Sequence, residues 1–237
     1  MSVRRLDPVQ PQSFAFSSAN LVWAEAKIAQ YPAGKQASAV IPILWKAQEQ
    51  EGWVSKPAIE AVAGLLAMPY VRVLEIATFY TQFQLSRTGS VAHVQVCGTT
   101  PCQLRGAGAL LDICRKRIAA RAHELSADGR FSWEEVECLG ACVNAPMAMV
   151  GSDTYEDLTG ASFTALLDGL ERGAPPNPGP QVARQLSAPE GGERTLTEAT
   201  LYDGSGVGAW RAAFEDRERT KVEKAAAAAA ALAPQKS

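Results

Sequence analysis

The chain has 237 residues, of which 47% are hydrophobic and 20% charged, so it is long enough to bury one or two hydrophobic cores. Its formal net charge of −2 argues against nucleic acid or an anionic membrane surface as a partner. The first residues lack the apolar core of a signal peptide, and no apolar stretch approaches the roughly 20 residues that span a bilayer. We therefore expect a cytoplasmic protein without direct membrane insertion.

The first third of the chain has the periodicity of helices. Helices are expected over about 18–30 and 36–50, a third starts at Ser55-Lys-Pro57, and Pro69 opens a fourth. Pro42 is expected to kink the second helix, because proline lacks a backbone donor. Four helices thus precede the first cysteine.

After residue 90 the pattern changes to short strands between helices. Gly151-Ser152-Asp153 separates two β-rich runs and predicts a hairpin turn. A last helix carries Phe163, Leu166 and Leu167 on one face. Strands are expected at 91–96, 131–136, 147–150 and 154–156, with a helix over 105–120. The resulting order, β-α-β-β-β-α, is similar to a thioredoxin core.

The chain from Gly173 onward reads as a linker and a tail. Ala174-Pro-Pro-Asn-Pro-Gly-Pro180 is expected to form neither helix nor sheet, since closely spaced prolines remove donors, and the ordered core is expected to end there. Beyond it the tail has a few isolated aromatic residues, which we call anchors because they could attach it to a partner, and an alanine-rich stretch of high helix propensity. The anchors are Tyr202, Trp210 and Phe214. We expect this tail to become ordered only against a partner.

Five cysteines are the most informative residues of the sequence. An odd number in a reducing compartment argues against a disulfide framework. Cys97 and Cys102 enclose four residues, and Cys138 and Cys142 enclose three, each pair following a predicted strand. Cys114 stands alone on the apolar stripe of a predicted helix, where a small buried side chain is the simpler interpretation. Two pairs of thiolates predict a metal or redox centre.

Four thiolates suit either a tetrahedral zinc ion or an iron–sulfur cluster. Structural zinc usually has a C-x2-C pair on at least one side, whereas both spacings here are wider and favour a cluster with two metal atoms. The helix expected after Cys102 would direct its positive N-terminal end at an anionic cluster. Arg105 either adds to that field or is a solvated residue. A zinc-stabilised interaction module without redox function remains the alternative.

Other cofactor motifs are missing from the sequence. It contains no G-x-G-x-x-G after a strand, no G-x-x-x-x-G-K-S/T and no C-x-x-C, so we expect no dinucleotide site, no nucleotide phosphate loop and no dithiol oxidoreductase activity. His93 and His123 lack the pair spacing of a Rieske centre and are expected to be structural or exposed. The electron donor is therefore expected on another chain.

Three segments resemble a known family: Ala77-Thr-Phe-Tyr80, Val96-Cys-Gly-Thr-Thr-Pro-Cys-Gln-Leu-Arg-Gly106 and Glu137-Cys-Leu-Gly-Ala-Cys-Val-Asn-Ala-Pro-Met147. Together with the helical N-terminal part they resemble the thioredoxin-like [2Fe-2S] ferredoxin subunit of the NADH dehydrogenase module of respiratory complex I (NADH:quinone oxidoreductase). The resemblance covers about residues 14 to 172. It implies an α+β chain with an N-terminal helical bundle over 14–86, a thioredoxin-like ferredoxin domain over 87–172, and an irregular tail over 173–237.

The resemblance also implies the function. Cys97, Cys102, Cys138 and Cys142 are expected to bind one [2Fe-2S] cluster, which exchanges single electrons with FMN on a partner flavoprotein subunit that also binds NADH. This chain alone is expected not to oxidise NADH. Its complex would sit on the cytoplasmic side of a bacterial inner membrane, with further complex I subunits as partners. The related subunits of NAD-linked formate dehydrogenases and hydrogenases are alternatives with the same chemistry.

Overall fold

The computed structural model describes residues 4–189 together with 191, 192, 195, 197, 198, 216, 219 and 220. Contacts within the chain divide it into one unit over residues 1–186 and another over 187–237. The helices and strands discussed below lie in the first unit. The tail anchors Tyr202, Trp210 and Phe214 and the alanine-rich stretch lie outside the described residues. No helix in the described part of the chain is long and apolar enough to cross a membrane.

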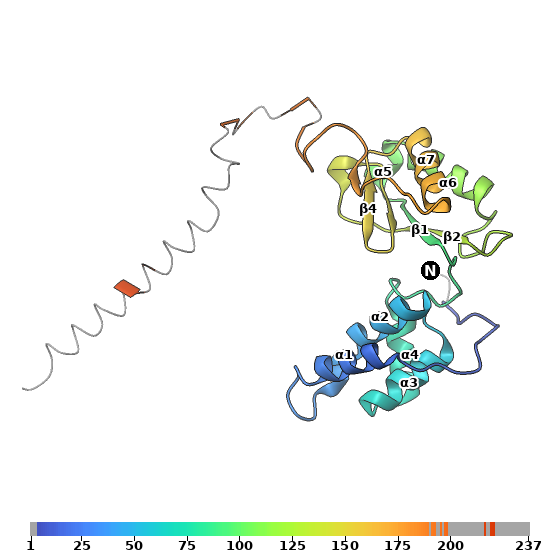
Figure 1. The fold of residues 1–237 in the computed structure, drawn as a ribbon, viewed down its shortest axis with the longest axis vertical. Helices are drawn as coiled ribbons and strands as arrows, with labels where there is room; N and C mark the ends of the chain where they lie inside the picture. The colour runs from blue at the N-terminus through green and yellow to red at the C-terminus, as the bar shows by residue number, and fades with distance from the viewer. Residues whose placement is uncertain are drawn as a thin grey trace, which may run out of the picture. The chain divides into compact units, whose positions relative to one another are not determined.

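The N-terminal part is a bundle of helices, as expected (Figure 1). It contains α1 (Ser18–Ile28), η1 (Gln36–Ala39), α2 (Val40–Glu51), α3 (Lys56–Leu66) and α4 (Tyr70–Phe79). The hydroxyl of Ser55 accepts a hydrogen bond from Ala58 N and caps α3, with Pro57 in the first turn. Apolar side chains from all of these helices form one core: Ala24, Ala39, Ile43, Leu44, Ile59, Val62, Leu66, Val73 and Ala77.

The second helix differs from the sequence expectation. The α-helix begins at Val40 and is preceded by the 3-10 turn η1, so Pro42 lies in the first turn of α2. A proline there removes an N–H that has no partner within the helix. The expected kink at Pro42 is therefore replaced by a helix start.

A five-stranded mixed sheet forms the second part, in the order β2-β1-β3-β4-β5. Its strands are β1 (Ala92–Cys97), β2 (Phe131–Val136), β3 (Ala148–Val150), β4 (Asp153–Glu156) and β5 (Gly179–Pro180). β1 and β2 are parallel, with Cys97 opposite Val136, whereas β3 is antiparallel to both β1 and β4. The predicted hairpin between β3 and β4 is confirmed, and so is the α+β class.

Helices cover one face of this sheet (Figure 1). The sequence predicts one helix over 105–120, but the structure has two, α5 (Thr100–Leu104) and α6 (Ala107–Arg117). Gly106 separates them with φ 105°, a left-handed conformation that favours glycine. α6 and α7 (Gly160–Glu171) pack against β1 and β2 through a core that includes Leu110, Leu111, Trp133, Phe163 and Leu166.

Polar side chains gather on the opposite face of the sheet. Glu134 is only 6% exposed, and its Oε1 accepts hydrogen bonds from Nε2 of Gln84 at 2.5 Å and Nε2 of Gln95 at 2.8 Å. Nε2 of His93 lies 3.1 Å from the same oxygen. Gln84 follows α4, so this network joins the helical bundle to the sheet. The histidine is structural, as the sequence predicts.

The proline-rich segment adds a strand to the sheet. Gly179 and Pro180 form β5, which is parallel to β4, and Gln181 N donates to Glu156 O at 2.9 Å. The expectation that residues 174–180 contribute no strand is wrong. The physical reason is that β5 is the edge strand of the sheet. A proline there lacks a backbone N–H, but no further strand lies beyond it to need that donor.

Candidate metal centre

The two cysteine pairs found in the sequence lie at the same end of the sheet. Cys97 is the last residue of β1 and Cys102 lies within α5, and each is 1% exposed. Cys138 and Cys142 lie in the exposed loop after β2, with their Sγ atoms 3.4 Å apart. Because β1 and β2 are parallel, their carboxyl ends bring the two pairs to the same edge.

Backbone groups after Cys138 act on the first pair. The backbone of Leu139, beside Cys138, acts to lower the pKa of Cys97, and the backbone of Met147 acts to lower the pKa of Cys102. Gly140, between Cys138 and Cys142, has φ 91°, which side chains other than glycine adopt only with strain. The loop can therefore turn tightly and return its second cysteine toward the first.

The thiols differ in acidity. Burial acts to raise the pKa of Cys97, but hydrogen bonds from the Thr99 hydroxyl and backbone outweigh it and hold that pKa below the usual value. Thr99 Oγ1 lies 3.2 Å from Cys97 Sγ. Burial, followed by the hydrogen bond to Cys97, raises the pKa of Cys102 to about 11. The hydrogen bond with Cys138 raises the pKa of Cys142. The charge interactions of Cys142 with Cys97 and Cys102, together with the contact between Cys138 and Cys142 sulfurs, bring the two pairs close to each other.

The cysteine pairs have buried apolar neighbours on one side and exposed apolar neighbours on the other. Cys97 and Cys102 pack with buried Ala107, Ala145 and Met147 in a small apolar cluster. Two large apolar side chains next to the ligand pairs are instead solvent-exposed: Leu104, at 82%, and Val143, at 64%. We call these two side chains the exposed rim of the cysteine site.

The donor set fits an iron–sulfur cluster. Soft thiolates bind iron–sulfur clusters and zinc, and the sulfurs already have polar neighbours: the Thr99 hydroxyl lies 3.2 Å from Cys97 Sγ, and Gly140 N donates to Cys138 Sγ at 3.4 Å. Among the described residues, no group of three or more His, Cys, Asp or Glu side chains is arranged around a single metal position. The thiols instead lie as two pairs, one buried and one exposed.

Most of the remaining candidates lie away from this edge. Cys114 is fully buried on the sheet-facing side of α6, and burial raises its pKa to about 12, as fits a small hydrophobic side chain. His93 and His123 both lie near Glu134, with His123 Nε2 3.7 Å from Oε2. Arg105 is exposed and stands between α5 and α6 instead of in the first turn of a long helix. Cys114, His93 and His123 therefore lie away from the cysteine pairs, whereas Arg105 remains beside Cys102, whose carbonyl accepts a hydrogen bond from Arg105 N at 3.1 Å.

Sequence reasoning missed one buried polar residue at the site. Asn144, two residues after Cys142, is 1% exposed and lies at the end of η2 (Cys142–Asn144). Its side-chain Nδ2 donates a hydrogen bond to Glu156 Oε2 at 2.5 Å, and its backbone carbonyl accepts one from Asp157 N at 2.7 Å. No local pattern signals this role, because its partners come from other elements.

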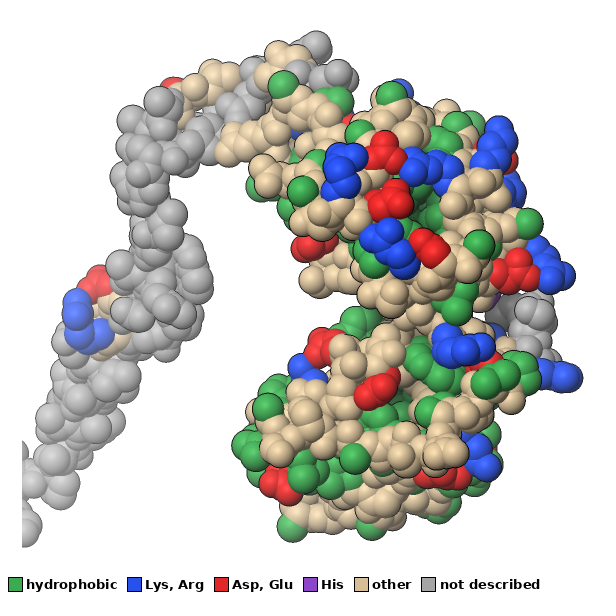
Figure 2. Space-filling model, turned by 45° about the vertical axis from the view of Figure 1, so that its right-hand side comes forward, with side chains coloured by type: hydrophobic (Ala, Val, Ile, Leu, Met, Phe, Trp, Pro, Cys, Tyr) green, Lys and Arg blue, Asp and Glu red, His purple; other side chains and the backbone are tan. Residues whose placement is uncertain are grey.

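Charge does not gather on the face of the molecule drawn in Figure 2, where acidic and basic side chains alternate over the described part of the chain. This distribution agrees with the formal net charge of −2. It gives no support for a polyanionic partner on that face.

Comparison with known proteins gives one family match. The family model described as thioredoxin-like [2Fe-2S] ferredoxin matches residues 24–171. An E subunit of the NADH-quinone oxidoreductase of Rhizobium meliloti (strain 1021) is 59% identical over 200 residues, which are 83% of this chain and 73% of that protein. The E subunit of the NADH-quinone oxidoreductase of Rickettsia conorii (strain ATCC VR-613 / Malish 7) is 48% identical over 67% of this chain and 95% of its own length.

Among solved structures, an NAD+-reducing [NiFe]-hydrogenase in the H2-reduced state is 19% identical over 56% of this chain and 22% of that chain, with a TM-score of 0.49. This likeness is too low to carry an argument.

Proposed function

From the premise that this chain belongs to the thioredoxin-like [2Fe-2S] ferredoxin family, we propose that it is an electron-transfer subunit of an NADH:quinone oxidoreductase. In this proposal Cys97, Cys102, Cys138 and Cys142 hold one [2Fe-2S] cluster, and single electrons pass between it and FMN on a partner flavoprotein subunit that also binds NADH. The observation that carries the proposal is the meeting of two cysteine pairs where the parallel strands β1 and β2 end, with the Sγ atoms of Cys138 and Cys142 3.4 Å apart.

Each part of the site has a definite role in this proposal. When bound, the cluster supplies a one-electron carrier whose potential depends on its surroundings. The Thr99 hydroxyl and the backbones of Leu139 and Met147 stabilise negative charge on the ligand sulfurs. Burial keeps water away from Cys97 and Cys102, while Cys138 and Cys142 remain at the surface. The open side therefore faces a partner.

The exposed rim supports a protein partner at that side. Leu104 lies two residues after Cys102, and Val143 follows Cys142 directly. Apolar contact there would exclude water between the cluster and an incoming cofactor and keep the transfer distance short. A flavoprotein subunit, as the resemblance implies, is the partner that we propose for this rim.

The sequence predicts a helical bundle over 14–86, a ferredoxin domain over 87–172 and a tail over 173–237. We propose this division with one change: the ferredoxin domain extends far enough to include β5, which pairs with β4. The enzymatic activity then belongs to the assembled complex, because neither a dinucleotide motif nor a phosphate loop occurs in this chain. Through that complex the subunit would sit on the cytoplasmic side of a bacterial inner membrane.

Anaerobic purification of the full chain tests the cluster. We expect a red-brown protein with about two irons and two acid-labile sulfides per chain, and an EPR signal of one unpaired electron after reduction. A colourless protein with zinc in place of iron would support a zinc-stabilised interaction module and overturn the proposal.

A second experiment tests the partner. The purified chain is expected to show no NADH-dependent dye reduction by itself, because it lacks a nucleotide fingerprint. The flavoprotein subunit of the same assembly is expected to bind it and to reduce its cluster in the presence of NADH. NADH oxidation by the isolated chain at the rate of the pair would contradict this assignment.

A further inference from the structure

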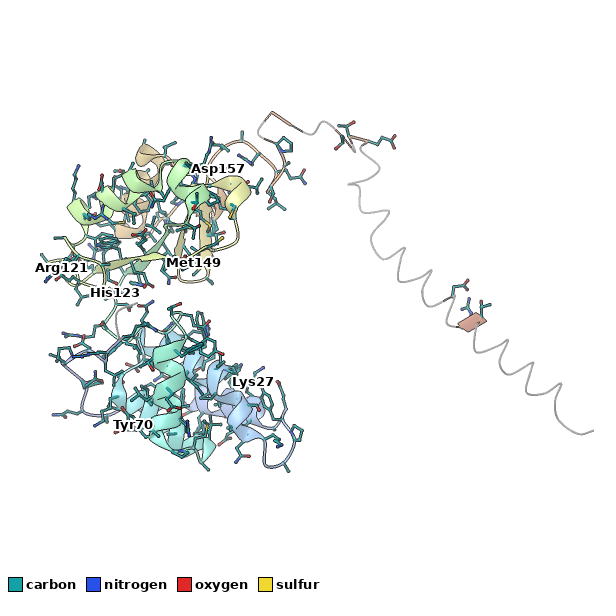
Figure 3. The ribbon with its side chains drawn as sticks, turned by 180° about the vertical axis from the view of Figure 1, so that it is seen from behind. Lys27, Tyr70, Arg121, His123, Met149 and Asp157 are labelled. Carbon is teal, nitrogen blue, oxygen red and sulfur yellow. The ribbon has the colours of Figure 1, made fainter. Side chains whose placement is uncertain are left out.

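The chain returns to the cysteine site after its last helix. Residues 179–186, which we call the strap, begin with β5 along the edge of β4 and lead to Leu186. The family model ends at residue 171, so the strap lies beyond the matched range. Asp157, labelled in Figure 3, lies at the end of β4 where the strap passes.

Arg184 is the residue of the strap that reaches furthest inward. Its side chain is 8% exposed, and its Nη2 lies 2.7 Å from Oδ1 of Asp157, whose side chain is 7% exposed. Its Nη1 donates to Oδ1 of Asn144 at 2.9 Å. A guanidinium can hold two acceptors in a fixed geometry, which a lysine cannot reproduce.

Asn144 connects this guanidinium to the ligand loop. Its amide Nδ2 donates to Glu156 Oε2 and also to the carbonyl of Leu186 at 3.1 Å, so both ends of its side chain amide are held. Its backbone N–H donates to Ala141 O at 2.9 Å, inside the loop that carries Cys138 and Cys142. Any shift of Asn144 would therefore move the exposed ligand pair.

We propose that Arg184 is a positioning residue for the metal centre, which acts through Asn144 to fix the loop of Cys138 and Cys142. The inference rests on the proposed function, since it assigns those cysteines as ligands. Cys138, Gly140 and Cys142 are exposed, and within the loop Leu139 and Ala141 pack only partly against the buried cysteine cluster, so a fixed anchor at its end limits how far the ligands can move. The strap is thereby part of the site.

The test compares iron-loaded full-length variants. Arg184→Gln removes both the positive charge and the guanidinium that holds two acceptors, whereas Arg184→Lys keeps the charge alone. Arg172→Gln is the matched control, because it removes an exposed positive charge at the end of α7. Three quantities are measured: the rate of iron release to a chelator, the EPR spectrum of the reduced cluster and its midpoint potential. We expect Arg184→Gln to release iron roughly tenfold faster, with shifted EPR g values and potential, as for loss of an outer-shell partner. Arg184→Lys should be intermediate, and Arg172→Gln should match the wild type.

Two results would overturn the role of Arg184. One is a glutamine variant that matches the control in all three measurements. The other is faster iron release with unchanged EPR spectrum and potential, which would mean that Arg184 only stabilises the fold. If the glutamine variant does not fold, the lysine variant is judged by the same criteria. A wild-type chain without iron would instead overturn the proposed function, so the two failures are distinguishable.

Discussion

Nε2 of Gln84 donates a hydrogen bond of 2.5 Å to Oε1 of Glu134, so an amide that follows the helical bundle reaches a carboxylate inside the sheet. Burial acts to raise the pKa of Glu134, but hydrogen bonds from His93 and Gln95 outweigh it and lower that pKa below its usual value. Arg4 adds positive charge nearby. The ionised carboxylate thus stabilises the junction of bundle and sheet.

The pH dependence of stability follows from this carboxylate. A lowered pKa in the folded state means that Glu134 stabilises the protein above a pH of about 4.5 and that this stabilisation is lost as the pH falls through the folded-state pKa. Burial also lowers the pKa of His123, so folding is weakened below a pH of about 6.5, where the unfolded chain binds the proton more readily. We expect the free energy of unfolding, from urea denaturation, to be flat around neutral pH, to fall in acid, and to fall again in alkali, where the unfolded Cys114 thiol ionises before the buried one.

Glu134→Gln checks the assignment. It should cost about 1–3 kcal/mol at pH 7 and flatten the loss of stability below pH 5, since a buried acceptor of charge-assisted hydrogen bonds is replaced. Glu135→Gln on the neighbouring, exposed position is the control and should leave both quantities unchanged. If the free energy of unfolding of the Glu134 variant still falls below pH 5 as steeply as in the wild type, the role of this carboxylate is contradicted.

Replacement of any one of Cys97, Cys102, Cys138 and Cys142 by serine should cut the iron content per chain to under about half, because each thiolate completes a set of four. Iron and sulfide assays, together with visible absorption, are the measurements. A silent substitution at one of the four positions would remove that residue from the ligand set.

Cys114→Ala should retain the full iron content, since this thiol faces the core between α6 and the sheet. The expected cost is about 1 kcal/mol in the free energy of unfolding, from the lost burial of one small group. Cys114→Ser should cost more, about 1–3 kcal/mol, because it buries a hydroxyl. Loss of iron in a variant that remains folded would make Cys114 a ligand candidate.

Thr99→Val removes the hydroxyl that lies 3.2 Å from Cys97 Sγ while keeping the shape of the side chain. If that hydrogen bond is worth about 1 kcal/mol more in the reduced cluster, the midpoint potential should become about 40 mV more negative in this one-electron couple. Thr100→Val, at the exposed first residue of α5, is the matched control. Equal potentials in the two variants would show that Thr99 does not tune the centre.

The exposed rim predicts a binding phenotype. Leu104→Gln and Val143→Gln together should weaken binding to the flavoprotein subunit by about tenfold or more, because truncating apolar interface centres commonly costs 1–2 kcal/mol or more each. Iron content and EPR spectrum should stay at wild-type values. Val22→Gln, on the equally exposed α1 surface, serves as control in the same binding titration. Unchanged affinity in the rim variant would place the partner elsewhere.

Local patterns in the sequence predicted most elements of the fold. The periodicity of the four helices, the Ser55 cap and the turn at Gly151-Ser152 act between residues only a few positions apart, so composition and spacing suffice to reveal them. The two spacings of the paired cysteines likewise pointed to one centre. At Pro42 and Gly106 the expected element was present but its boundary depended on a single backbone conformation, whereas the strand β5 was not expected at all.

Only the tertiary structure shows what supports the site. Arg184 is 27 residues from Asp157 and 40 from Asn144, and Gln84 is 50 residues from Glu134. Contacts between residues so far apart produce no periodic pattern in the sequence. They form only when the strands and the strap close long loops around a common core. The four candidate ligands could therefore be proposed from the chain itself, whereas the buried polar contacts beside their loop arise only when distant segments fold together.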